Sequence, residues 1–210
     1  DMDIPSFVMD KDVTAEQLDL VMEGFRESLG RGKSVAFVIR KGALTFDHAV
    51  NYQNPYPLTR EEILEHIVKA SGEDIVIATT GKTGRELYEI RERQGQGHQC
   101  DFLTVGSMGH SSSIALGIAL NKPDRKVWCI DGDGAALMHM GAFAVLGRYS
   151  PSNLVHIVIN NEAHESVGGM PTVADRTDLA GVAGACGYPY TACIGLDDGE
   201  DTAGRLDREL

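Results

Sequence analysis

The stretch VWCIDGDGAALMHMG, from Val127 to Gly141, joins an apolar run to an acidic glycine turn. Residues 127–130 are typical of a buried strand, and the residues from Ala135 onward predict a helix. A strand, a glycine turn and a helix start often bind phosphate, because backbone N–H groups and the helix dipole point at the anion. Asp133 lies between the two glycines and would repel a phosphate bound directly to the turn. The stretch therefore predicts an anion site that also needs a cation.

Short apolar strands alternate with helices on both sides of this turn. We expect strands at 74–81, 101–109, 125–134, 153–161 and 190–196. We expect helices at 59–68, 82–94, 110–121, 135–149 and 177–188, with a last helix within 201–210. This alternation predicts a doubly wound, mostly parallel α/β sheet with helices on both faces. Ligands in such sheets bind beyond the carboxyl ends of the strands.

The N-terminal part of the chain has its own pattern. Residues 1–7 are loop-like, a capping box at residues 14–17 predicts a helix start, and residues 34–42 predict a buried strand. The segment NYQNPYP at 51–57 is typical of a linker. We therefore divide the chain into residues 1–45, a linker at 46–58 and a main domain at 59–210. Both ends look cut, so we expect a fragment of a longer protein, with the main domain truncated at its C-terminus.

Composition excludes some partners. A net charge of −12 argues against binding to nucleic acid or to an anionic membrane surface. No apolar run approaches membrane-spanning length, and no signal peptide opens the chain. The four cysteines are scattered without a metal-ligand spacing, which predicts buried free thiols and a reducing, cytoplasmic location.

Two nucleotide-binding motifs fail at single positions. A P-loop ending at Lys82 needs glycine where Val76 stands, and a dinucleotide fingerprint needs glycine where Leu137 stands. A hard cation between the carboxylate and a phosphate explains the turn better, because Mg²⁺ bridges protein oxygens and substrate phosphates. The predicted metal ligands are the Asp133 carboxylate, the Asn161 amide oxygen and the Ala163 carbonyl.

A GDG turn after one strand and an NN pair after the next resembles the thiamin diphosphate enzyme fingerprint. The chain also resembles 2-oxo acid decarboxylases acting on phosphonopyruvate and, more distantly, on sulfopyruvate. This wider resemblance rests on the segments TTGKTGRELYE, DFLTVGSMGHSSSIALGIAL, DGDGAALMHMGA and NLVHIVINNEAHESVGGMPT. The resemblance covers about residues 59–210 and assigns cofactor contacts to Thr80, Gly81, Ser107, Met108, Gly109, Gly132, Gly134, Ala135 and Asn161. Met108 would supply the apolar wedge that bends the cofactor. Glu162 stands where many relatives have glycine or alanine.

The resemblance also implies an activity. It is decarboxylation of phosphonopyruvate to phosphonoacetaldehyde and CO₂ with thiamin diphosphate and Mg²⁺, this chain being the diphosphate-binding part. The family's catalytic glutamate lies on a pyrimidine-binding domain and acts across a subunit interface, so a homo-oligomer is expected. Residues 1–45 resemble the end of that domain, and the isolated fragment should be inactive. Sulfopyruvate or another short anionic 2-oxo acid remains open as substrate, as do a non-catalytic cofactor-holding subunit and a nucleotide-dependent oxidoreductase.

Several of these residues also have simpler interpretations. Asp133 and Asn161 are common at turns and helix caps. Lys82 is either a solvated helix-start residue or a phosphate neighbour. His110 and His164 follow strand ends and are candidates for contacting the substrate's phosphonate or donating a proton, or they only make structural hydrogen bonds.

Overall fold

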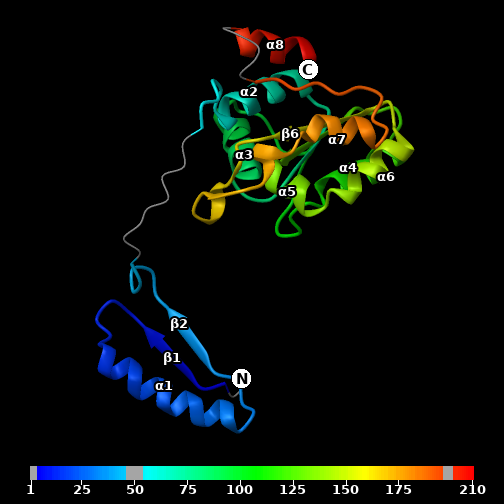
Figure 1. Cartoon of the computed structure of the whole chain (residues 1–210). Coiled ribbons are helices and arrows are strands. Elements are labelled where there is room, and N and C mark those ends of the chain that lie inside the picture. The colour runs from blue at the N-terminus through cyan, green and yellow to red at the C-terminus, as the bar shows by residue number, and fades with distance from the viewer. Residues whose placement is uncertain (1–3, 46–53, 196–200) are drawn as a thin grey trace. The chain divides into compact units, whose positions relative to one another are not determined.

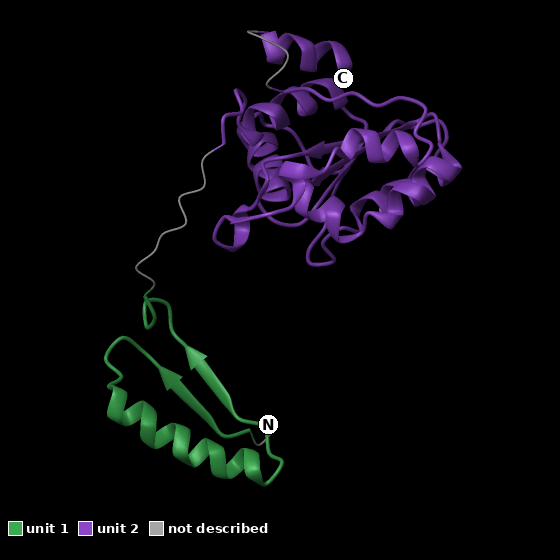
Figure 2. Cartoon of the chain, in the orientation of Figure 1, with its two compact units in different colours: residues 1–49 green, residues 50–210 purple. Residues whose placement is uncertain are grey.

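The computed structural model describes residues 4–45, 54–195 and 201–210. The chain forms two compact units, residues 1–49 and 50–210, which Figure 2 draws in different colours. Of the linker expected at 46–58, residues 46–53 lie outside the described part, and residues 54–58 have no helix or strand. The assignment of residues 1–45 to a pyrimidine-binding domain stays a prediction.

The first unit is a parallel strand pair joined by one helix. Strand β1 (Ser6–Met9) leads into α1 (Ala15–Gly30) and then into β2 (Ala36–Ile39), which pairs with β1 in parallel. The capping box is confirmed, because Thr14 and Gln17 each accept the other's backbone N–H. The loop expected at 1–7 is wrong at Ser6 and the next residue, which belong to β1. The run before the helix is too short to show a strand period.

The second unit is a parallel sheet covered by helices (Figure 1). Its main strands are β3 (Ile75–Ala78), β4 (Asp101–Leu103), β5 (Val127–Gly132) and β6 (Leu154–Ile159), in the order β4-β3-β5-β6. Its longer helices are α2 (Arg60–Ser71), α3 (Lys82–Arg93), α4 (Ser111–Asn121), α6 (Gly141–Tyr149), α7 (Leu179–Ala185) and α8 (Thr202–Glu209). All these strand pairs are parallel, which confirms the predicted fold class.

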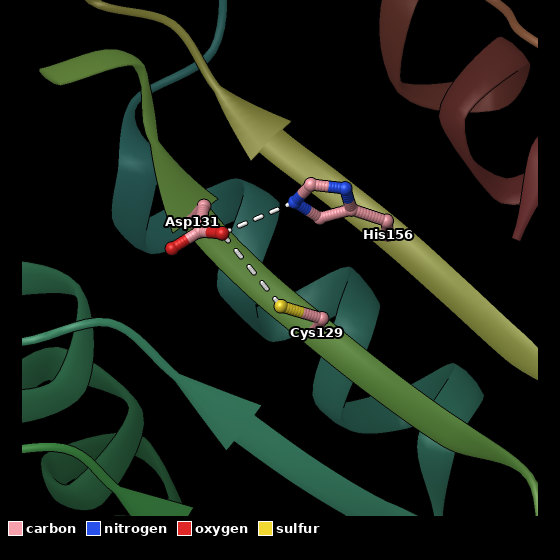
Figure 3. A group of neighbouring side chains, drawn as sticks. All are labelled: Cys129, Asp131 and His156. Carbon is pink, nitrogen blue, oxygen red and sulfur yellow. Dashed lines mark hydrogen bonds and ion pairs between the residues drawn. The ribbon is translucent and has the colours of Figure 1, made fainter. Parts of the chain in front are cut away.

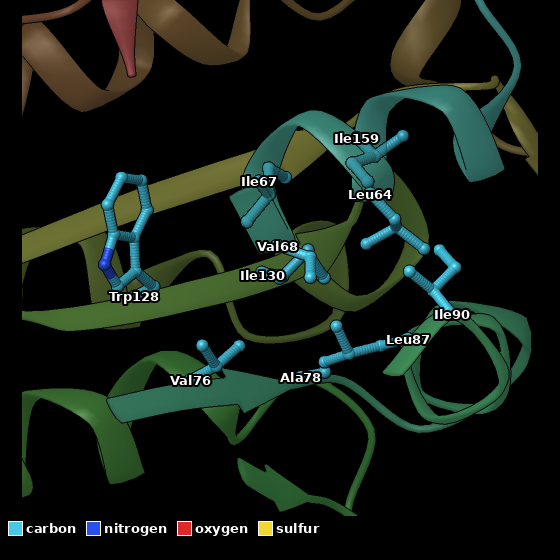
Figure 4. Packing of buried hydrophobic residues seen from close by; sticks show 10 residues of the cluster. All are labelled: Leu64, Ile67, Val68, Val76, Ala78, Leu87, Ile90, Trp128, Ile130 and Ile159. Carbon is cyan, nitrogen blue, oxygen red and sulfur yellow. The ribbon is translucent and has the colours of Figure 1, made fainter. Parts of the chain in front are cut away.

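Alternate strand residues pack on opposite faces of the sheet. On one face Val76, Trp128 and Ile130 are fully buried against α2 and α3, as Figure 4 shows. On the other face Ile77 and Cys129 are fully buried against α4. Burying each large apolar side chain contributes about 1.5–3 kcal/mol, so the two layers hold the strand ends in fixed positions. Within the described residues, no helix combines the length and apolar character needed to cross a bilayer.

Three predicted elements differ from the structure. The helix expected at 135–149 begins earlier, as α5 (Asp133–Met138), and is separated from α6 at His139 and Met140. Backbone dihedrals at His139 leave the helical region, and its ring packs against His110 instead. The strand expected at 101–109 ends at Leu103, because the chain turns through left-handed residues at Gly106, Ser107 and Gly109.

The strand expected at 190–196 is wrong over residues 190–195, and residue 196 lies outside the described part. Pro189 precedes the run, and Tyr190 is 68% exposed. Strand β6 pairs with β5, and residues 190–195 form no ladder with it. A short hairpin of β7 (Ala163–His164) and β8 (Met170–Pro171), joined by the 3₁₀ turn η1 (Glu165–Val167), was not expected.

The strand order places a switch point between β3 and β5. From β3 the chain crosses to β4 on one side, and β5 and β6 are added on the other. In doubly wound sheets the ligand crevice opens at this reversal, beyond the carboxyl ends of the two strands. Thr80 follows β3 and Asp133 follows β5, so two predicted site segments meet there.

Candidate functional site: the crevice beyond β3, β5 and β6

A small cavity lies at the switch point. Its volume of about 60 Å³ is room for about two water molecules. Gly132, Asp133, Gly134 and Ala135, from the end of β5 and the start of α5, form one wall. The predicted glycine turn therefore lines a crevice of the kind that the sequence indicates.

Asp133 is the buried acid of this turn. It is 3% exposed, and its carboxylate accepts a hydrogen bond from the Thr172 hydroxyl. Burial raises the pKa of Asp133 from its ordinary 3.8, although hydrogen bonds from Thr172 and two backbone N–H groups act in the opposite direction. A carboxylate in such surroundings is stabilised when a cation lies beside it.

The end of β6 forms the facing wall. Asn161, Ala163 and His164 line the same cavity as Asp133. Asn161 Oδ1 accepts from the Ala163 N–H at 3.3 Å, and its Nδ2 donates to Glu165 Oε2 at 3.3 Å. The structure thus brings together the three predicted metal ligands, although their role as ligands stays a prediction.

The remaining lining comes from the end of β3 and the loop after β4. Thr80, Gly81 and Met108 line the cavity. A Cβ atom at Gly134 would lie 3.2 Å from Met108 Cε and 2.6 Å from His164 Cε1. Glycine at this position therefore leaves space between two side chains that face the turn.

Three predicted residues lie apart from this lining. Ser107, Gly109 and His110 belong to the loop that leads into α4, and the cavity walls do not include them. His110 Nδ1 lies 3.2 Å from the Ser107 carbonyl oxygen, and its ring centroid lies 4.1 Å from that of His139. Of the two candidate histidines, His164 is the one that the fold places at the crevice.

An ion-pair cluster that sequence reasoning missed lies at the same cavity. Arg60 Nη1 contacts Glu165 Oε2 at 2.5 Å, and Lys82 pairs with the other carboxylate oxygen. Burial alone would raise the pKa of Glu165, but hydrogen bonds from Lys82 and Arg60 hold it below its ordinary value. Lys82 is thus an ion-pair partner at the cavity rather than a freely solvated residue, and nothing in the local sequence marks Arg60 or Glu165.

A second polar cluster lies inside the sheet, on strands β5 and β6 (Figure 3). His156 Nε2 lies 3.1 Å from Asp131 Oδ2, Cys129 Sγ lies 3.7 Å from the same oxygen, and His156 Nδ1 lies 2.9 Å from the Tyr188 hydroxyl. Burial and the Asp131 charge raise the pKa of the Cys129 thiol. These hydrogen bonds give the cluster a structural role. The scattered Cys and His spacing did not predict it, because the strand register brings Cys129 beside His156.

The cysteine prediction holds only in part. All four cysteines are free thiols, but Cys129 alone is buried, Cys193 is exposed, and Cys100 and Cys186 are intermediate.

A larger hollow adjoins the switch-point cavity and shares Arg60, Asn161 and Glu165 with it. It has a volume of about 1280 Å³ and runs along β6, the last strand of the sheet order, toward residues 188–195 and α8. Its middle is lined by mainly apolar side chains such as Leu154, Ile157 and Ala183. We assign it to the unpaired side of β6, where the strand expected at 190–196 would have lain.

The donor set at the switch-point cavity fits a magnesium diphosphate. One buried carboxylate, one amide oxygen and a backbone carbonyl are the oxygen ligands that Mg²⁺ takes, and the metal usually retains water and substrate phosphate oxygens as well. Asp133, Asn161 and Ala163 would hold the metal.

Comparison with known proteins identifies the class. Residues 79–203 match the family described as "Thiamine pyrophosphate enzyme, C-terminal TPP binding domain". The chain therefore belongs to the thiamine pyrophosphate enzymes. A solved structure of a thiamin diphosphate-dependent enzyme from Mycobacterium smegmatis shares the fold, with a TM-score of 0.55 and 18% identity over 87% of this chain and 40% of that one.

Within this family, the chain is similar to named decarboxylases. It is 43% identical to phosphonopyruvate decarboxylase of Streptomyces viridochromogenes over 68% of this chain and 35% of that protein. It is 37% identical to the sulfopyruvate decarboxylase beta subunit of Methanocaldococcus jannaschii over 69% of this chain and 74% of that subunit. The chain spans about a third of the length of the phosphonopyruvate decarboxylases that it matches.

Proposed function

We propose that this chain is the diphosphate- and Mg²⁺-binding part of a decarboxylase that converts phosphonopyruvate to phosphonoacetaldehyde and CO₂. Identities of 43% and 45% to two phosphonopyruvate decarboxylases support the substrate. The observation that carries the proposal is the meeting of Asp133 and Asn161 at one cavity beyond the switch point.

Each residue has a task in this proposal. The Asp133 carboxylate, the Asn161 amide oxygen and the Ala163 carbonyl hold Mg²⁺, and the glycine turn gives the diphosphate close access to the backbone. Bound thiamin diphosphate supplies the electron sink that decarboxylation of a 2-oxo acid requires. His164 is the candidate for contacting the substrate's anionic group or donating a proton.

The proposal includes partners. A pyrimidine-binding domain, from the same or a second subunit, supplies the catalytic glutamate, so the working protein is an oligomer, most simply a homo-oligomer. The relatives named as beta subunits support a two-part organisation. Neither nucleic acid nor a membrane is a partner in this proposal, in keeping with the charge of −12, and the location is cytoplasmic.

Sulfopyruvate is the alternative substrate. The chain is 37% identical to one sulfopyruvate decarboxylase beta subunit and 34% identical to a sulfopyruvate decarboxylase of Methanosarcina acetivorans, which supports this alternative. A sulfonate carries one negative charge and a phosphonate up to two, so the same oxygen-binding groups serve either. A non-catalytic cofactor-holding subunit is the second alternative.

The test is CO₂ release by the assembled protein that contains this chain and the pyrimidine-binding domain. With thiamin diphosphate and Mg²⁺ present, we expect the highest kcat/KM on phosphonopyruvate, then sulfopyruvate, and much less on pyruvate. Preference for sulfopyruvate would establish the alternative substrate. Absence of CO₂ release from all three acids, with cofactor bound, would establish a cofactor-holding role.

A further inference from the structure

Three donor groups converge on one carboxylate at the rim of the cavity. Arg60 is the first residue of α2, Lys82 the first residue of α3, and Asn161 follows β6. Arg60 Nη1 lies 2.5 Å from Glu165 Oε2, Asn161 Nδ2 lies 3.3 Å from the same oxygen, and Lys82 Nζ contacts Oε1. Two cations and an amide from three separate elements therefore surround a single anionic group.

The arginine is fixed in this orientation from behind. Glu86 accepts from Arg60 Nε at 2.7 Å and from Nη2 at 2.6 Å, so the guanidinium plane is set by a bidentate pair. The Arg60 side chain is 14% exposed, and its remaining edge points to Glu165. A planar, pre-oriented guanidinium beside a lysine is the donor set that proteins use for carboxylate, phosphate and related oxyanions.

The occupant of this position lies on a short, glycine-flanked turn. Glu165 belongs to the short turn η1, which joins two strands of two residues each, and Gly168 and Gly169 after it are left-handed. Its side chain is 36% exposed, so water screens part of its attraction to Arg60 and Lys82. Glu165 lines both this cavity and the larger hollow along β6, so a ligand that enters the crevice meets its side chain at the junction of the two.

We propose that Arg60, Lys82 and Asn161 form an oxyanion subsite, which Glu165 fills in the ligand-free chain and yields to a phosphoryl or phosphonyl group of a ligand. The inference rests on the proposed function and adds a recognition site to it. Two groups of this chemistry reach the crevice in that function, the terminal phosphate of the cofactor and the phosphonate of the substrate. The experiment distinguishes them.

The test uses two variants with opposite expected signs in the assembled protein. Lys82→Gln removes a cation from the subsite, and Glu165→Gln removes the charge of the internal competitor. Lys122→Gln and Glu89→Gln make the same chemical changes at exposed positions and serve as controls. Calorimetry gives the Kd of thiamin diphosphate with Mg²⁺ and of methylphosphonate, and steady-state assays give KM for phosphonopyruvate and pyruvate.

We expect Lys82→Gln to weaken binding of the subsite's ligand about tenfold and Glu165→Gln to tighten it several-fold, with both controls unchanged. A changed cofactor Kd assigns the subsite to the cofactor's phosphate. An unchanged cofactor Kd, with KM altered for phosphonopyruvate but not for pyruvate, assigns it to the substrate. Loss of binding in both variants, or no change in either, would overturn the inference and leave a structural ion-pair cluster.

Binding of methylphosphonate distinguishes a failure of the oxyanion subsite from a failure of the proposed decarboxylase function. It carries the anionic group without the oxo acid, so its binding tests the subsite even if no CO₂ is released. Methylphosphonate that binds wild type and Lys82→Gln equally would speak against the subsite whatever the activity of the protein.

Discussion

Asp131 and Asp133 stand two residues apart in the segment IDGDG, and both are almost fully buried, at 1% and 3% exposure. Asp131 is the last acid within β5 and pairs sideways with His156 on β6. Asp133 begins α5, beyond the strand, and lines the cavity at the switch point. An aspartate is thus part of the core at position 131 and part of the crevice at position 133.

The difference shows that burial alone does not define a site. Asp131 meets its partners inside the sheet, where neighbouring strands fix them through the ladder register. Asp133 has Thr172 as a partner, but it also faces an opening lined by Asn161 and Ala163. A carboxylate with internal partners stabilises the fold, whereas one that faces a crevice can bind a cation.

Replacing each aspartate by alanine should give the largest difference in the free energy of unfolding between the two positions. Asp131→Ala leaves His156 and Cys129 without their shared acceptor and should lower the free energy of unfolding by about 3 kcal/mol. Asp133→Ala also removes a carboxylate whose charge burial disfavours, so its loss should stay below about 1 kcal/mol. Urea unfolding of both variants measures the two values. Equal losses would contradict the separation of roles.

A smaller effect is expected from the partners of Asp131. His156→Gln should lower the free energy of unfolding by about 1–2 kcal/mol, because it disturbs two buried hydrogen bonds, and Tyr188→Phe should lower it by about 1 kcal/mol, because it removes one. Thermal unfolding gives the stability, and calorimetry gives cofactor affinity in the same samples. Both variants should bind Mg²⁺ and cofactor like wild type once folded; a large loss of affinity would place this cluster in the site.

The smallest effect is a pH dependence at Asp133. Its pKa is raised in the folded, ligand-free chain, so the protonated form is favoured there and the associated stability is present at low pH. That contribution disappears as pH rises above the ordinary value of 3.8 and through the raised pKa. Wild type should therefore lose stability relative to Asp133→Asn between these pH values. Parallel pH profiles of the two proteins would contradict the direction of the shift.

Much of the fold was predictable, because helix starts and strands follow local patterns in the sequence. Capping boxes at Thr14 and Thr59 mark helix starts, and the apolar runs of β3, β5 and β6 mark strands. The run at 190–195 was misread, because a strand needs a partner and its apolar pattern cannot show whether one is available. The break at His139 was not predictable either, since its ring packs against His110 of a distant segment, a contact that the local sequence does not show.

The site was predictable at the strand ends and not at its rim. Asp133, Asn161 and Ala163 follow directly from where apolar strands stop. Arg60 and Glu165 could not be found in this way, since their pairing joins residues that lie far apart along the chain. The sequence could not show on which side His110 lies, because a histidine after a strand can turn either toward the crevice or, as here, onto a neighbouring ring.

Calorimetric titration of the assembled protein with thiamin diphosphate, with and without Mg²⁺, tests the central claim most directly. Wild type should bind the cofactor only when Mg²⁺ is present, and Asp133→Asn should weaken that binding at least about tenfold, while Tyr188→Phe leaves it unchanged. Binding that is equally tight without Mg²⁺, or in Asp133→Asn, would contradict the assignment of this acid as the metal ligand of the crevice.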